Sequence, residues 1–495
     1  MNGSPRIALS TLLHGVAAVG RDAELTDLTL DSRQVTPGGA FLACRGLRHH
    51  GLDFAQDVAR RGAAAIVWEP DGVHQPPSMH SDIVLAEVPE LGRHASLLAD
   101  RFFASPSQQV DVVGVTGTNG KTTCAWLLAQ ALTFCGERAA YIGTLGSAFA
   151  GELVAGEMTT PDAITVQRGL AAFHARGARK VAMEVSSHGL ALGRVQAVHF
   201  DATVFTNLTR DHLDFHGDMT AYGAAKASLF ERDDVRLRVF NVDDAFGAML
   251  AARPQFADRI ACSSRSGAVP DRGAFVRAHS MQFTAVGTRF ELATSFGNAA
   301  VQTPLVGAFN IDNLLAVAAV LLGSDISLSR AVAAIGVLQA PPGRLEVIAV
   351  PGQPLAVVDY AHTPDALEQA LRVLRRHCTG RLIVVFGCGG DRDSGKRPLM
   401  GAAAARAADR IVLTDDNPRS EDALQILADI QRGTGAAPVT VVQDRRAAIA
   451  HALQHASAGD VVLVAGKGHE TTQVTGTGTR PFSDRQVVRE VLGVA

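Results

Sequence analysis

The seven residues that most constrain the fold of this chain are Gly117, Thr118, Asn119, Gly120, Lys121, Thr122 and Thr123. They separate an apolar, β-branched run at 110–115 from a helical pattern at 124–135. In a strand–loop–helix of this kind, the N–H groups of the loop close around phosphate oxygens, and the helix N-terminus stabilises the negative charge. The lysine then reaches the outer phosphates, and the first threonine hydroxyl holds Mg²⁺. The stretch therefore predicts a nucleotide-binding α/β domain.

The loop departs from the full phosphate-loop pattern at one position. That pattern has a glycine five residues before Gly120, where this chain has Val115. The loop is thus a shortened variant, Gly-Thr-Asn-Gly-Lys-Thr. The alternative, a glycine-rich turn with an exposed lysine, is disfavoured because the strand, the loop, the Lys-Thr pair and the helix all agree.

Length and charge set the general class. A chain of 495 residues corresponds to roughly three domains, and 47% hydrophobic residues are enough for packed cores. The formal net charge of -3 gives no basic excess for nucleic acid or an anionic membrane, so small-molecule chemistry is expected. Six cysteines without a C-x-x-C pair indicate reduced, structural thiols. Without a signal peptide or a membrane-length apolar run, we expect a soluble, cytoplasmic protein with no membrane span.

Strand and helix patterns divide the chain into three α/β domains, at 1–107, 108–340 and 341–495. The first is expected to contain strands at 28–33, 40–44 and 63–68, a helix at 53–62 and a linker at 105–108. The second is the P-loop domain, with a mostly parallel sheet. The third alternates strands and helices, one helix being capped by Thr363 before Pro364, which is typical of a doubly wound, Rossmann-like fold. Its strands are expected at 356–360, 382–386, 411–414, 439–442 and 461–465.

Polar residues follow two further apolar runs of the central domain. The run at 179–185 carries Glu184 at its end, where open α/β sheets bind ligands, so Glu184 is placed to bind Mg²⁺. The segment 204–217 packs acids and histidines together, among them His212. The next helix is expected to place Tyr222, Lys226 and Phe230 on one face, which is an unusual setting for a solvated lysine.

These motifs together resemble the Mur ligases, the ATP-dependent amide ligases that build the peptidoglycan stem peptide. The resemblance rests on the loop at 117–123, on the segments 183–188 and 207–217, and on Lys226, and it extends over about 28–485. It implies that residues 117–123 bind ATP and that CO₂ carbamylates Lys226, which turns this cation into a Mg²⁺ ligand. It also implies that Thr122 and Glu184 hold one Mg²⁺, and that Glu184, His212 and Lys226 hold a second. The catalytic residues are then Lys121, Glu184, His212 and Lys226.

The resemblance further implies a site for a nucleotide-linked peptide. Thr159-Thr160-Pro161-Asp162 matches the substrate loop of the family, with Ser186 and Arg194 as further contacts. Position 192, a Gln in some relatives, is Leu192 here. Leu30, Ser32 and the loop at 47–49 are candidate contacts in the first domain, although turn and surface residues of these types are often purely structural.

Two segments are similar to the adenine-side and hinge motifs of the family. The segment 307–313 opens a helix and gives Asn310 and Asn313 as ATP contacts, and Arg344 follows the Pro-Pro-Gly break at 341–343. The alternative for the asparagines is that they cap the helix. The linker near Gly343 is the expected hinge for a closing movement that joins the ATP and amino-acid sites.

The tetrapeptide Asp416-Asn417-Pro418-Arg419 gives the sharpest prediction of specificity. The branch of the family that adds meso-diaminopimelate has this sequence, and the branch that adds L-lysine lacks the arginine. Diaminopimelate is lysine with one extra carboxylate, which a guanidinium fork suits. The same resemblance gives Arg392 as a second carboxylate contact, and Gly466 and Glu470 as contacts to an ammonium group. Arg392 also occupies the third glycine position of a dinucleotide fingerprint at 387–392, which disfavours a dehydrogenase.

The predicted reaction joins meso-diaminopimelate to UDP-N-acetylmuramoyl-L-Ala-D-Glu with ATP and two Mg²⁺ ions, in a monomer. Within the ligases, the L-lysine-adding enzyme and a folylpolyglutamate synthase are the alternatives, disfavoured by Arg419 and by the N-terminal domain. From another class, a GTPase is disfavoured because the chain has no Asn-Lys-x-Asp guanine motif. A P-loop kinase is disfavoured because it would not need an amino-acid site with this pattern. A nucleotide sensor is disfavoured because it needs no second metal site.

Overall fold

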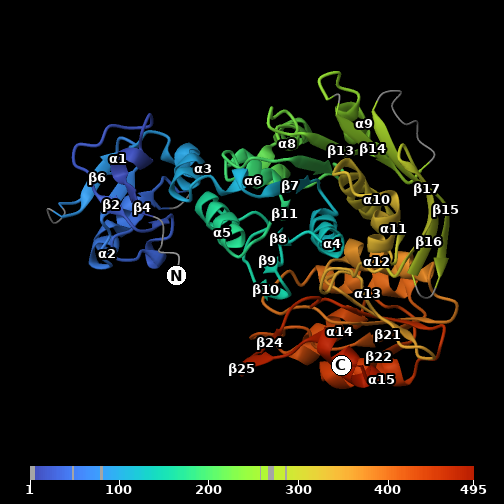
Figure 1. Cartoon of the computed structure of the whole chain (residues 1–495). Helices are drawn as coiled ribbons and strands as arrows, with labels where there is room; N and C mark the ends of the chain where they lie inside the picture. The colour runs from blue at the N-terminus through green and yellow to red at the C-terminus, as the bar shows by residue number, and fades with distance from the viewer. Residues whose placement is uncertain are drawn as a thin grey trace. The chain divides into compact units, whose positions relative to one another are not determined.

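The computed structural model describes residues 6–46, 49–78, 82–256, 258–265, 273–284 and 287–494. They form two compact units, Met1–Ala261 with Pro270–Gly273, and Cys262–Val269 with Ala274–Ala495. Both units are built from strands and helices (Figure 1). The α/β class expected from the sequence is confirmed for each of them.

The first unit begins with a small domain around a four-stranded parallel sheet, in the order β3-β4-β5-β6. Its elements are β1 (Ile7–Ala8), α1 (Leu9–Leu12), β2 (Glu24–Leu25), β3 (Leu28–Thr29), β4 (Ala40–Ala43), α2 (Ala55–Arg60), β5 (Ala65–Trp68), β6 (Val84–Glu87), α3 (Leu91–Phe102) and 3₁₀ turns at Ser32–Gln34, Gly51–Phe54 and Pro106–Gln108. Strand β3 is shorter than expected because Asp31 caps the first 3₁₀ turn by accepting the N–H of Arg33. The expected linker is a packed turn, in which the buried Ser107 accepts the N–H of His199 at 3.0 Å.

The first unit continues with the P-loop sheet, in the order β10-β9-β8-β11-β7-β12-β13-β14. Its elements are β7 (Asp111–Thr116), α4 (Lys121–Phe134), β8 (Ala139–Gly143), β9 (Gly146–Phe149), β10 (Glu152–Val154), α5 (Ala163–Ala175), β11 (Lys180–Glu184), α6 (Ser187–Ala191), β12 (Ala202–Phe205), α7 (Leu213–His216), α8 (Met219–Ala227), β13 (Leu237–Asn241), α9 (Ala245–Ala251) and β14 (Arg259–Ser263). Strands β8, β11, β7, β12 and β13 are parallel neighbours, as the sequence predicts. Their carboxyl ends therefore meet at one edge.

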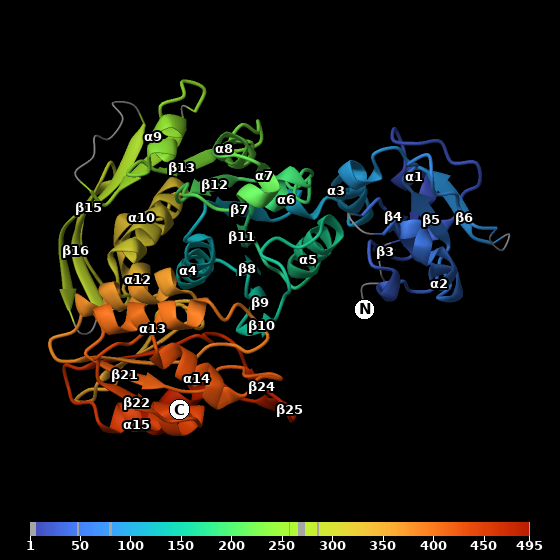
Figure 2. The ribbon, with the colours of Figure 1, turned by 180° about the vertical axis from the view of Figure 1, so that it is seen from behind.

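The central strands are apolar along their whole length because both faces of the sheet are covered. Figure 2 shows α4 and α5 on opposite sides of β7, β11 and β8. Alternate residues of β11, Val181 and Met183, belong to the core that includes Leu170 and Phe173 of α5. The opposite face packs on α4, which contacts all three strands. A half-exposed sheet would instead alternate apolar and polar residues.

The second unit begins with an antiparallel meander and two helices. Its first elements are β15 (Ala274–Thr284), β16 (Gly287–Thr294), β17 (Gly297–Thr303), α10 (Ala308–Gly323) and α11 (Leu328–Ile335). Helix α10 is apolar from Leu314 onward and is buried over most of its length. His377 fastens this part to the next, because its ring accepts the N–H of Gly307 at 3.0 Å and contacts the carbonyl of Thr284 at 2.8 Å.

The second unit ends with a doubly wound domain, in the sheet order β18-β19-β23-β20-β21-β22. Its elements are β18 (Glu346–Ile348), β19 (Leu355–Asp359), α12 (Pro364–Arg375), β20 (Leu382–Phe386), α13 (Lys396–Ala407), β21 (Arg410–Leu413), α14 (Ala423–Gln431), β22 (Val439–Val441), α15 (Arg445–Gln454), β23 (Val461–Ala465), β24 (Thr472–Thr475), β25 (Gly478–Pro481) and α16 (Asp484–Leu492). Thr363 caps α12 by accepting the N–H of Ala366, which confirms the predicted cap. The five predicted strands are also confirmed to within about one residue.

The side chains of β23 point alternately to the two faces of the sheet, and each face packs against helices. In β23, Val461, Leu463 and Ala465 share a core with α12, α13 and α14. The residues between them, Val462 and Val464, share a second core with α15 and α16. Since side chains of a strand point alternately to the two faces, an unbroken apolar run satisfies both cores.

Two helix boundaries differ from expectation in ways that matter for the site. Helix α4 begins at Lys121 rather than at 124, so the lysine and Thr122 are already in the first helical turn. Helix α8 ends at Ala227, so the prediction that Phe230 shares its face with Lys226 is wrong. Phe230 instead packs against Phe205 and Phe240.

Candidate active site

The phosphate loop lies where β7 ends, between the ends of β11 and β12. Strand register pairs Val115 with Glu184 on one side and Thr116 with Phe205 on the other. The strand continues through Thr116, so the loop begins only at Gly117, which accounts for the shortened pattern. A Cβ on Gly117 would lie 1.9 Å from the Thr206 hydroxyl, so only glycine fits there. The loop is further held by N–H donation from Thr118 and Asn119 to Asn207, at 2.8 and 2.9 Å.

Glu184 and Thr122 form the acidic side of the loop. The Thr122 hydroxyl donates to the Glu184 carboxylate at 2.9 Å. The same carboxylate, which is fully buried, accepts the Tyr141 hydroxyl at 2.5 Å and the Thr144 N–H at 2.7 Å. Carboxylate and hydroxyl oxygens are ligands that suit Mg²⁺, and the buried carboxylate is oriented before any cation arrives. The pair predicted to share one Mg²⁺ is therefore in direct contact.

Lys226 has the environment of a neutral amine. Its side chain is 1% exposed, its Nζ donates to the Gly117 carbonyl at 2.8 Å, and it lies 4.5 Å from the centre of the Tyr222 ring. Lys121 donates to the same carbonyl at 2.9 Å. Burial, and then the neighbouring charge of Lys121, lower the pKa of Lys226 to about 6. At neutral pH the amine therefore keeps its lone pair.

His212 lies at the open end of this group, on the segment before α7. It has a left-handed backbone, with φ of 51°, and its ring packs against Tyr222 and His188, at centroid distances of 6.1 and 4.8 Å. Tyr222 also hydrogen-bonds Thr118 of the phosphate loop, with 3.0 Å between the oxygens. The structure thus brings His212 and Lys226 to the same aromatic ring.

The predicted substrate loop packs against the end of β11. The Thr160 hydroxyl donates to the carbonyl of Glu184 at 3.0 Å and accepts the N–H of Ser186 at 2.9 Å. Arg194 donates to the carbonyl of Thr160 at 2.8 Å, and Thr159 contacts Thr144 at 3.0 Å. The four predicted residues Thr159, Thr160, Ser186 and Arg194 therefore lie together. The Ser186 hydroxyl also caps α6, since it accepts the N–H of Gly189.

The small N-terminal domain is tied to this loop through α5. Arg168 donates to Asp27 at 2.8 Å and to the carbonyl of Leu28 at 2.6 Å, just before Leu30 and Ser32. Both of these predicted residues are partly exposed. In the predicted loop at 47–49, residues 47 and 48 lie outside the described residues. Leu192 is 48% exposed, so it leaves an apolar surface where a glutamine would be polar.

The predicted adenine-side and hinge residues lie in the second unit. Gly307 caps α10, and the Asn310 side chain donates back to the Val306 carbonyl at 2.8 Å, so the asparagines are not the helix cap. Asn313 donates to the Asn310 side chain at 3.1 Å. Arg344 lies over the Tyr360 ring, with its Cζ 5.2 Å from the centroid.

Arg344 and His469 each have one buried nitrogen without a hydrogen-bond partner among the described residues. Among the described residues, neither Arg344 Nε nor Nδ1 of His469 makes a hydrogen bond, although both are buried. His469 also packs against Tyr360, at 5.1 Å between ring centroids. Buried polar atoms are almost always hydrogen-bonded, so these two nitrogens are exceptions to the general rule.

Three loops at the carboxyl edge of the C-terminal sheet carry the predicted amino-acid residues. Arg419 donates to the carbonyl of Gly390 at 2.6 Å, and Asn417 donates to Glu470 at 2.9 Å. Arg392 is exposed on the first loop, near Arg419. Asp416, Asn417 and Pro418 are buried, and Gly466 fits closely over Asp416, where an added Cβ would lie 2.5 Å from its Oδ2. All seven predicted residues are therefore gathered at this edge.

Sequence reasoning missed two buried cations that hold these loops. Lys467 is fully buried, and its Nζ donates to Asn417 at 3.0 Å and to Glu470 at 2.8 Å. Arg445, also fully buried, pairs with Asp484. A lysine between two glycines and an arginine at a helix start are typical of exposed positions, so no local signal marked them.

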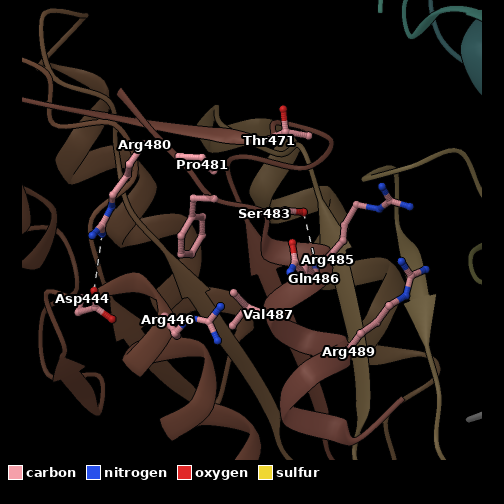
Figure 3. Close-up of a pocket in the computed structure, with 11 residues that line it drawn as sticks. Asp444, Arg446, Thr471, Arg480, Pro481, Ser483, Arg485, Gln486, Val487 and Arg489 are labelled. Carbon is pink, nitrogen blue, oxygen red and sulfur yellow. Dashed lines mark hydrogen bonds and ion pairs between the residues drawn. The ribbon is translucent and has the colours of Figure 1, made fainter. Parts of the chain in front are cut away.

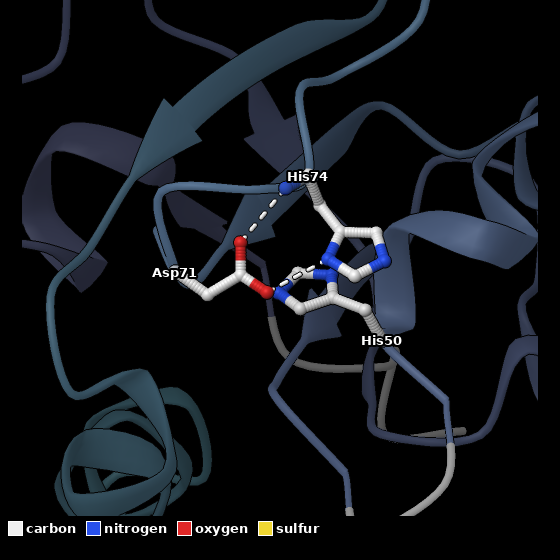
Figure 4. A group of neighbouring side chains, drawn as sticks. All are labelled: His50, Asp71 and His74. Atoms are coloured by element: carbon white, nitrogen blue, oxygen red, sulfur yellow. Dashed lines mark hydrogen bonds and ion pairs between the residues drawn. The ribbon is translucent and has the colours of Figure 1, made fainter.

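A cluster of two histidines and an aspartate in the N-terminal domain resembles a metal site, but the ring nitrogens of His50 already have protein partners. His50, Asp71 and His74 have side-chain atoms close enough to hold an ion (Figure 4). However, Nδ1 of His50 accepts the N–H of Leu52 at 3.1 Å, and its Nε2 contacts the carbonyl of Glu69 at 2.9 Å. Both nitrogens of this ring are thus occupied, and the cluster fastens the loop at 69–74 instead.

The fold and the site define a P-loop enzyme with a buried neutral amine beside the nucleotide loop and a separate cationic site on a Rossmann-like domain. Family models match three segments: the Mur ligase family catalytic domain at 24–96, the Mur ligase middle domain at 115–321, and the Mur ligase glutamate ligase domain at 343–468. The chain belongs to the Mur ligase family, and the resemblance found in its motifs is confirmed.

Full-length relatives support this assignment. A Pseudomonas aeruginosa protein named UDP-N-acetylmuramoyl-L-alanyl-D-glutamate--2,6-diaminopimelate ligase is 48% identical over 95% of this chain and 96% of its own. A Xanthomonas campestris protein of the same name is 49% identical over 99% and 98%. A solved structure of a ligase with that name is 33% identical, covers 99% of both chains and has a TM-score of 0.74.

More distant structures show the fold alone. An Acinetobacter baumannii MurF is 18% identical, covers 95% of this chain and 94% of its own, and has a TM-score of 0.66. The three-domain α/β fold of the family is thus confirmed for this chain. Among its described residues, no helix combines the length and apolarity needed to cross a membrane.

Proposed function

We propose that this chain is an ATP-dependent ligase that joins meso-diaminopimelate to the D-Glu carboxylate of UDP-N-acetylmuramoyl-L-Ala-D-Glu. The observation that carries the proposal is the presence of Arg419, in its Asp-Asn-Pro-Arg loop, in a chain that is 48% identical to a ligase of that name. ATP supplies the γ-phosphate, the D-Glu γ-carboxylate attacks it in line, and ADP leaves. The amine of diaminopimelate then attacks the acyl phosphate, and phosphate leaves as the amide forms.

The nucleotide site has three parts. Residues 117–123 would surround the β- and γ-phosphates with backbone N–H groups, and Lys121 would release the carbonyls that it now contacts in order to reach the γ-phosphate. Asn310 and Asn313 would contact the adenine. Arg344, with its unpaired Nε, would contact ATP from the C-terminal domain.

Two Mg²⁺ ions fit the donors beside the loop. Thr122 and Glu184 would hold one, and Glu184, His212 and a carbamate on Lys226 would hold the other. When bound, these ions neutralise charge that develops on the transferred phosphoryl group. The close contact between Thr122 and Glu184 supports this arrangement.

The low pKa of Lys226 supports its carbamylation. The neutral Nζ would attack the carbon of CO₂, forming an N–C bond, and one proton would leave the nitrogen for water. The product is a carbamate, whose carboxylate oxygens would turn a neutral amine into an anionic metal ligand. A lysine with its ordinary pKa would be protonated and unable to attack at neutral pH.

The amino-acid site would recognise both ends of diaminopimelate. Arg419 and Arg392 would bind the carboxylate that lysine lacks, while Glu470 and Gly466 would bind the ammonium group, with Asp416, Asn417 and Pro418 shaping the loop. Lysine would leave the arginine fork unpaired, and a mismatch of this kind discriminates by about 10⁴–10⁵. The UDP-linked peptide would contact Thr159, Thr160, Ser186 and Arg194, with Leu30 and Ser32 in the first domain.

The same proposal includes domains at 1–107, 108–340 and 341–495, a monomer, a cytoplasmic location and a closing movement of the domains.

The hinge of this movement would lie just before Gly343 rather than after it. The close packing of Gly343 on Gly468 supports this position, because a Cβ on Gly343 would lie 2.2 Å from the backbone of Gly468.

The test is phosphate release by the purified protein with ATP, Mg²⁺ and the UDP-linked dipeptide. One reaction receives meso-diaminopimelate and another receives L-lysine, each over a range of bicarbonate concentrations. Release with diaminopimelate alone is expected. Release with lysine alone would retain the ligase and overturn the role of Arg419, whereas release with neither would direct attention to a P-loop kinase or GTPase.

A further inference from the structure

The most deeply buried ion pair of the C-terminal domain joins the starts of two helices. Arg445 is the first residue of α15 and Asp484 is the first residue of α16, and both side chains are 0% exposed. Two hydrogen bonds of 2.7 Å connect the guanidinium to the two carboxylate oxygens. Asp484 neutralises Arg445 and fixes the plane of its fork.

Stability alone does not account for this pair. Taking two charges out of water costs several kcal/mol per ion, and well-packed apolar residues often replace such a pair without loss. The first turn of α15 is also an unfavourable place for a cation, because a helix N-terminus carries partial positive charge. The explanation must therefore lie in what else the guanidinium binds.

The remaining hydrogen bonds of Arg445 reach two different loops. One Nη donates to the carbonyl of Asp415 at 3.3 Å, and the other donates to the carbonyl of Ala465 at 2.9 Å. Asp415 directly precedes the Asp-Asn-Pro-Arg segment at 416–419. Ala465 directly precedes the Gly-Lys-Gly-His-Glu segment at 466–470. One guanidinium thus connects the bases of the two loops that hold six of the seven predicted amino-acid contacts.

The loops are spaced tightly above this connection. Asp416 is 9% exposed and lies against Gly466, and Gln473 donates to the Asp416 carbonyl at 2.8 Å. Burial raises the pKa of the Asp416 carboxyl, and the charges of Arg445 and Lys467 oppose that rise. A shift of one loop base by a fraction of an ångström would therefore alter both the packing and the charge balance of the site.

A pocket of about 580 Å³ lies beside the pair, but it is not a second anion site (Figure 3). Its four arginines already have partners. Arg446 pairs with Glu490, Arg480 donates to Gln473, and Arg485 and Arg489 both contact Glu346. The residues that flank the pair, Asp444 and Ser483, cap their helices on the pocket side. The pair is therefore a dry connection behind a solvated surface.

We propose that Arg445, oriented by Asp484, is a positioning residue of the amino-acid site: it sets the spacing between the loop that carries Arg419 and the loop that carries Glu470. The inference rests on the proposed function of these loops. Removal of the Arg445 guanidinium should weaken diaminopimelate binding selectively, since its hydrogen bonds run to the bases of the two amino-acid loops.

The experiment measures KM for each of the three substrates, and kcat, in Arg445→Met, Arg445→Lys and Asp484→Asn. A displaced loop should raise KM for diaminopimelate roughly 10- to 100-fold in Arg445→Met, with KM for ATP and for the UDP-linked dipeptide within about twofold. Arg445→Lys can restore one carbonyl contact at most, so an intermediate increase is expected. Thermal unfolding of each variant is recorded alongside, and kinetics are measured below its transition.

Arg381→Met is the matched control. Arg381 makes a similar two-point contact with Asp460, at 2.7 and 3.2 Å, but at the opposite, amino ends of β20 and β23. It should lower the unfolding temperature without changing KM for diaminopimelate. Equal changes in all three KM values, or none, in the Arg445 variants would overturn the inference. If Arg445→Met does not fold, the same comparison is decided by Asp484→Asn and Arg445→Lys.

Arg419→Lys separates the inference from the function on which it rests. A raised KM for diaminopimelate in Arg419→Lys, without a raised KM in the Arg445 variants, would leave the site assignment standing and refute only the positioning role. An unchanged KM in Arg419→Lys would refute the site assignment itself.

Discussion

The P-loop site and the proposed amino-acid site are built in opposite ways. The P-loop site uses backbone groups of consecutive residues, with Lys226 and Glu184 supplied by the strand ends and the helix beside it. The proposed amino-acid site uses side chains from three loops far apart in the chain, and the buried cations Arg445 and Lys467 join two of these loops. The first kind of site depends on local geometry and one tuned pKa, whereas the second depends on distant charges that hold loops in place.

The largest expected effect is at Lys226. Lys226→Met keeps the apolar volume but removes the amine, so kcat should fall by about 10³-fold, in line with the loss of one group that stabilises the transition state. Phosphate release measures the change. The control is Lys180→Met, because Lys180 lies at the other end of β11 and pairs with Asp111, and it should retain activity. Equal losses in both variants would mean that the central sheet, and not the amine, is responsible.

The next effect is at Arg419. Arg419→Lys keeps the charge but loses the planar fork, and we expect KM for diaminopimelate to rise by about 10²-fold while L-lysine becomes a less poor substrate. Competition between the two amino acids in one reaction measures the discrimination. If Arg419→Lys kept the preference for diaminopimelate over L-lysine, the specificity would reside outside the Asp-Asn-Pro-Arg loop. The contrast drawn between the two sites would then be weaker.

A smaller effect is expected from pH, and only at the P-loop site. Because the proposed carbamylation needs the neutral amine of Lys226, whose pKa is about 6, carbamate should be lost as pH falls through 6 and retained above it. One unit below the pKa, about a tenth of the amine is neutral. Carbon-13 NMR with labelled CO₂, at constant dissolved CO₂, measures the carbamate signal, and Lys226→Met is the blank. A signal that disappears only near the ordinary lysine pKa would contradict the tuned amine.

The smallest effect is expected from Tyr222→Phe. The ring remains over Lys226, and only the 3.0 Å hydrogen bond to Thr118 is lost. A single neutral hydrogen bond contributes about 1 kcal/mol, so KM for ATP should change by less than about tenfold. A much larger loss would mean that the hydroxyl has a role in the reaction itself.

The difference between the two sites also explains what the sequence could predict. The strand, loop and helix at 110–135 are neighbours in the chain, so their arrangement follows from local pattern, and β7 and α4 were predicted within a few residues. The C-terminal strands were predicted for the same reason. The Asp-Asn-Pro-Arg loop was identified by its resemblance to a family motif.

The buried connections of the amino-acid site could not be predicted. Arg445 and Asp484 are 39 residues apart, and nothing in either helix indicates that its first residue loses all contact with water. The end of α8 was missed for a related reason, since Phe230 satisfies a helical spacing while tertiary packing places it against Phe205. Burial of a charge is decided by partners that become neighbours only after folding.

The contact between Gly343 and Gly468 closes the part of the C-terminal domain that lies between these two residues. The family model for this domain begins and ends at those two residues, 343 and 468, whose backbones touch. A segment whose ends meet can be exchanged between relatives without moving the flanking chain, which is the geometry that favours modular evolution and domain grafting. The ion pair between Arg445 and Asp484 must be transferred with this segment. Arg445 lies inside the segment and Asp484 outside it, so a graft that omits α16 separates a buried charge from its counter-ion.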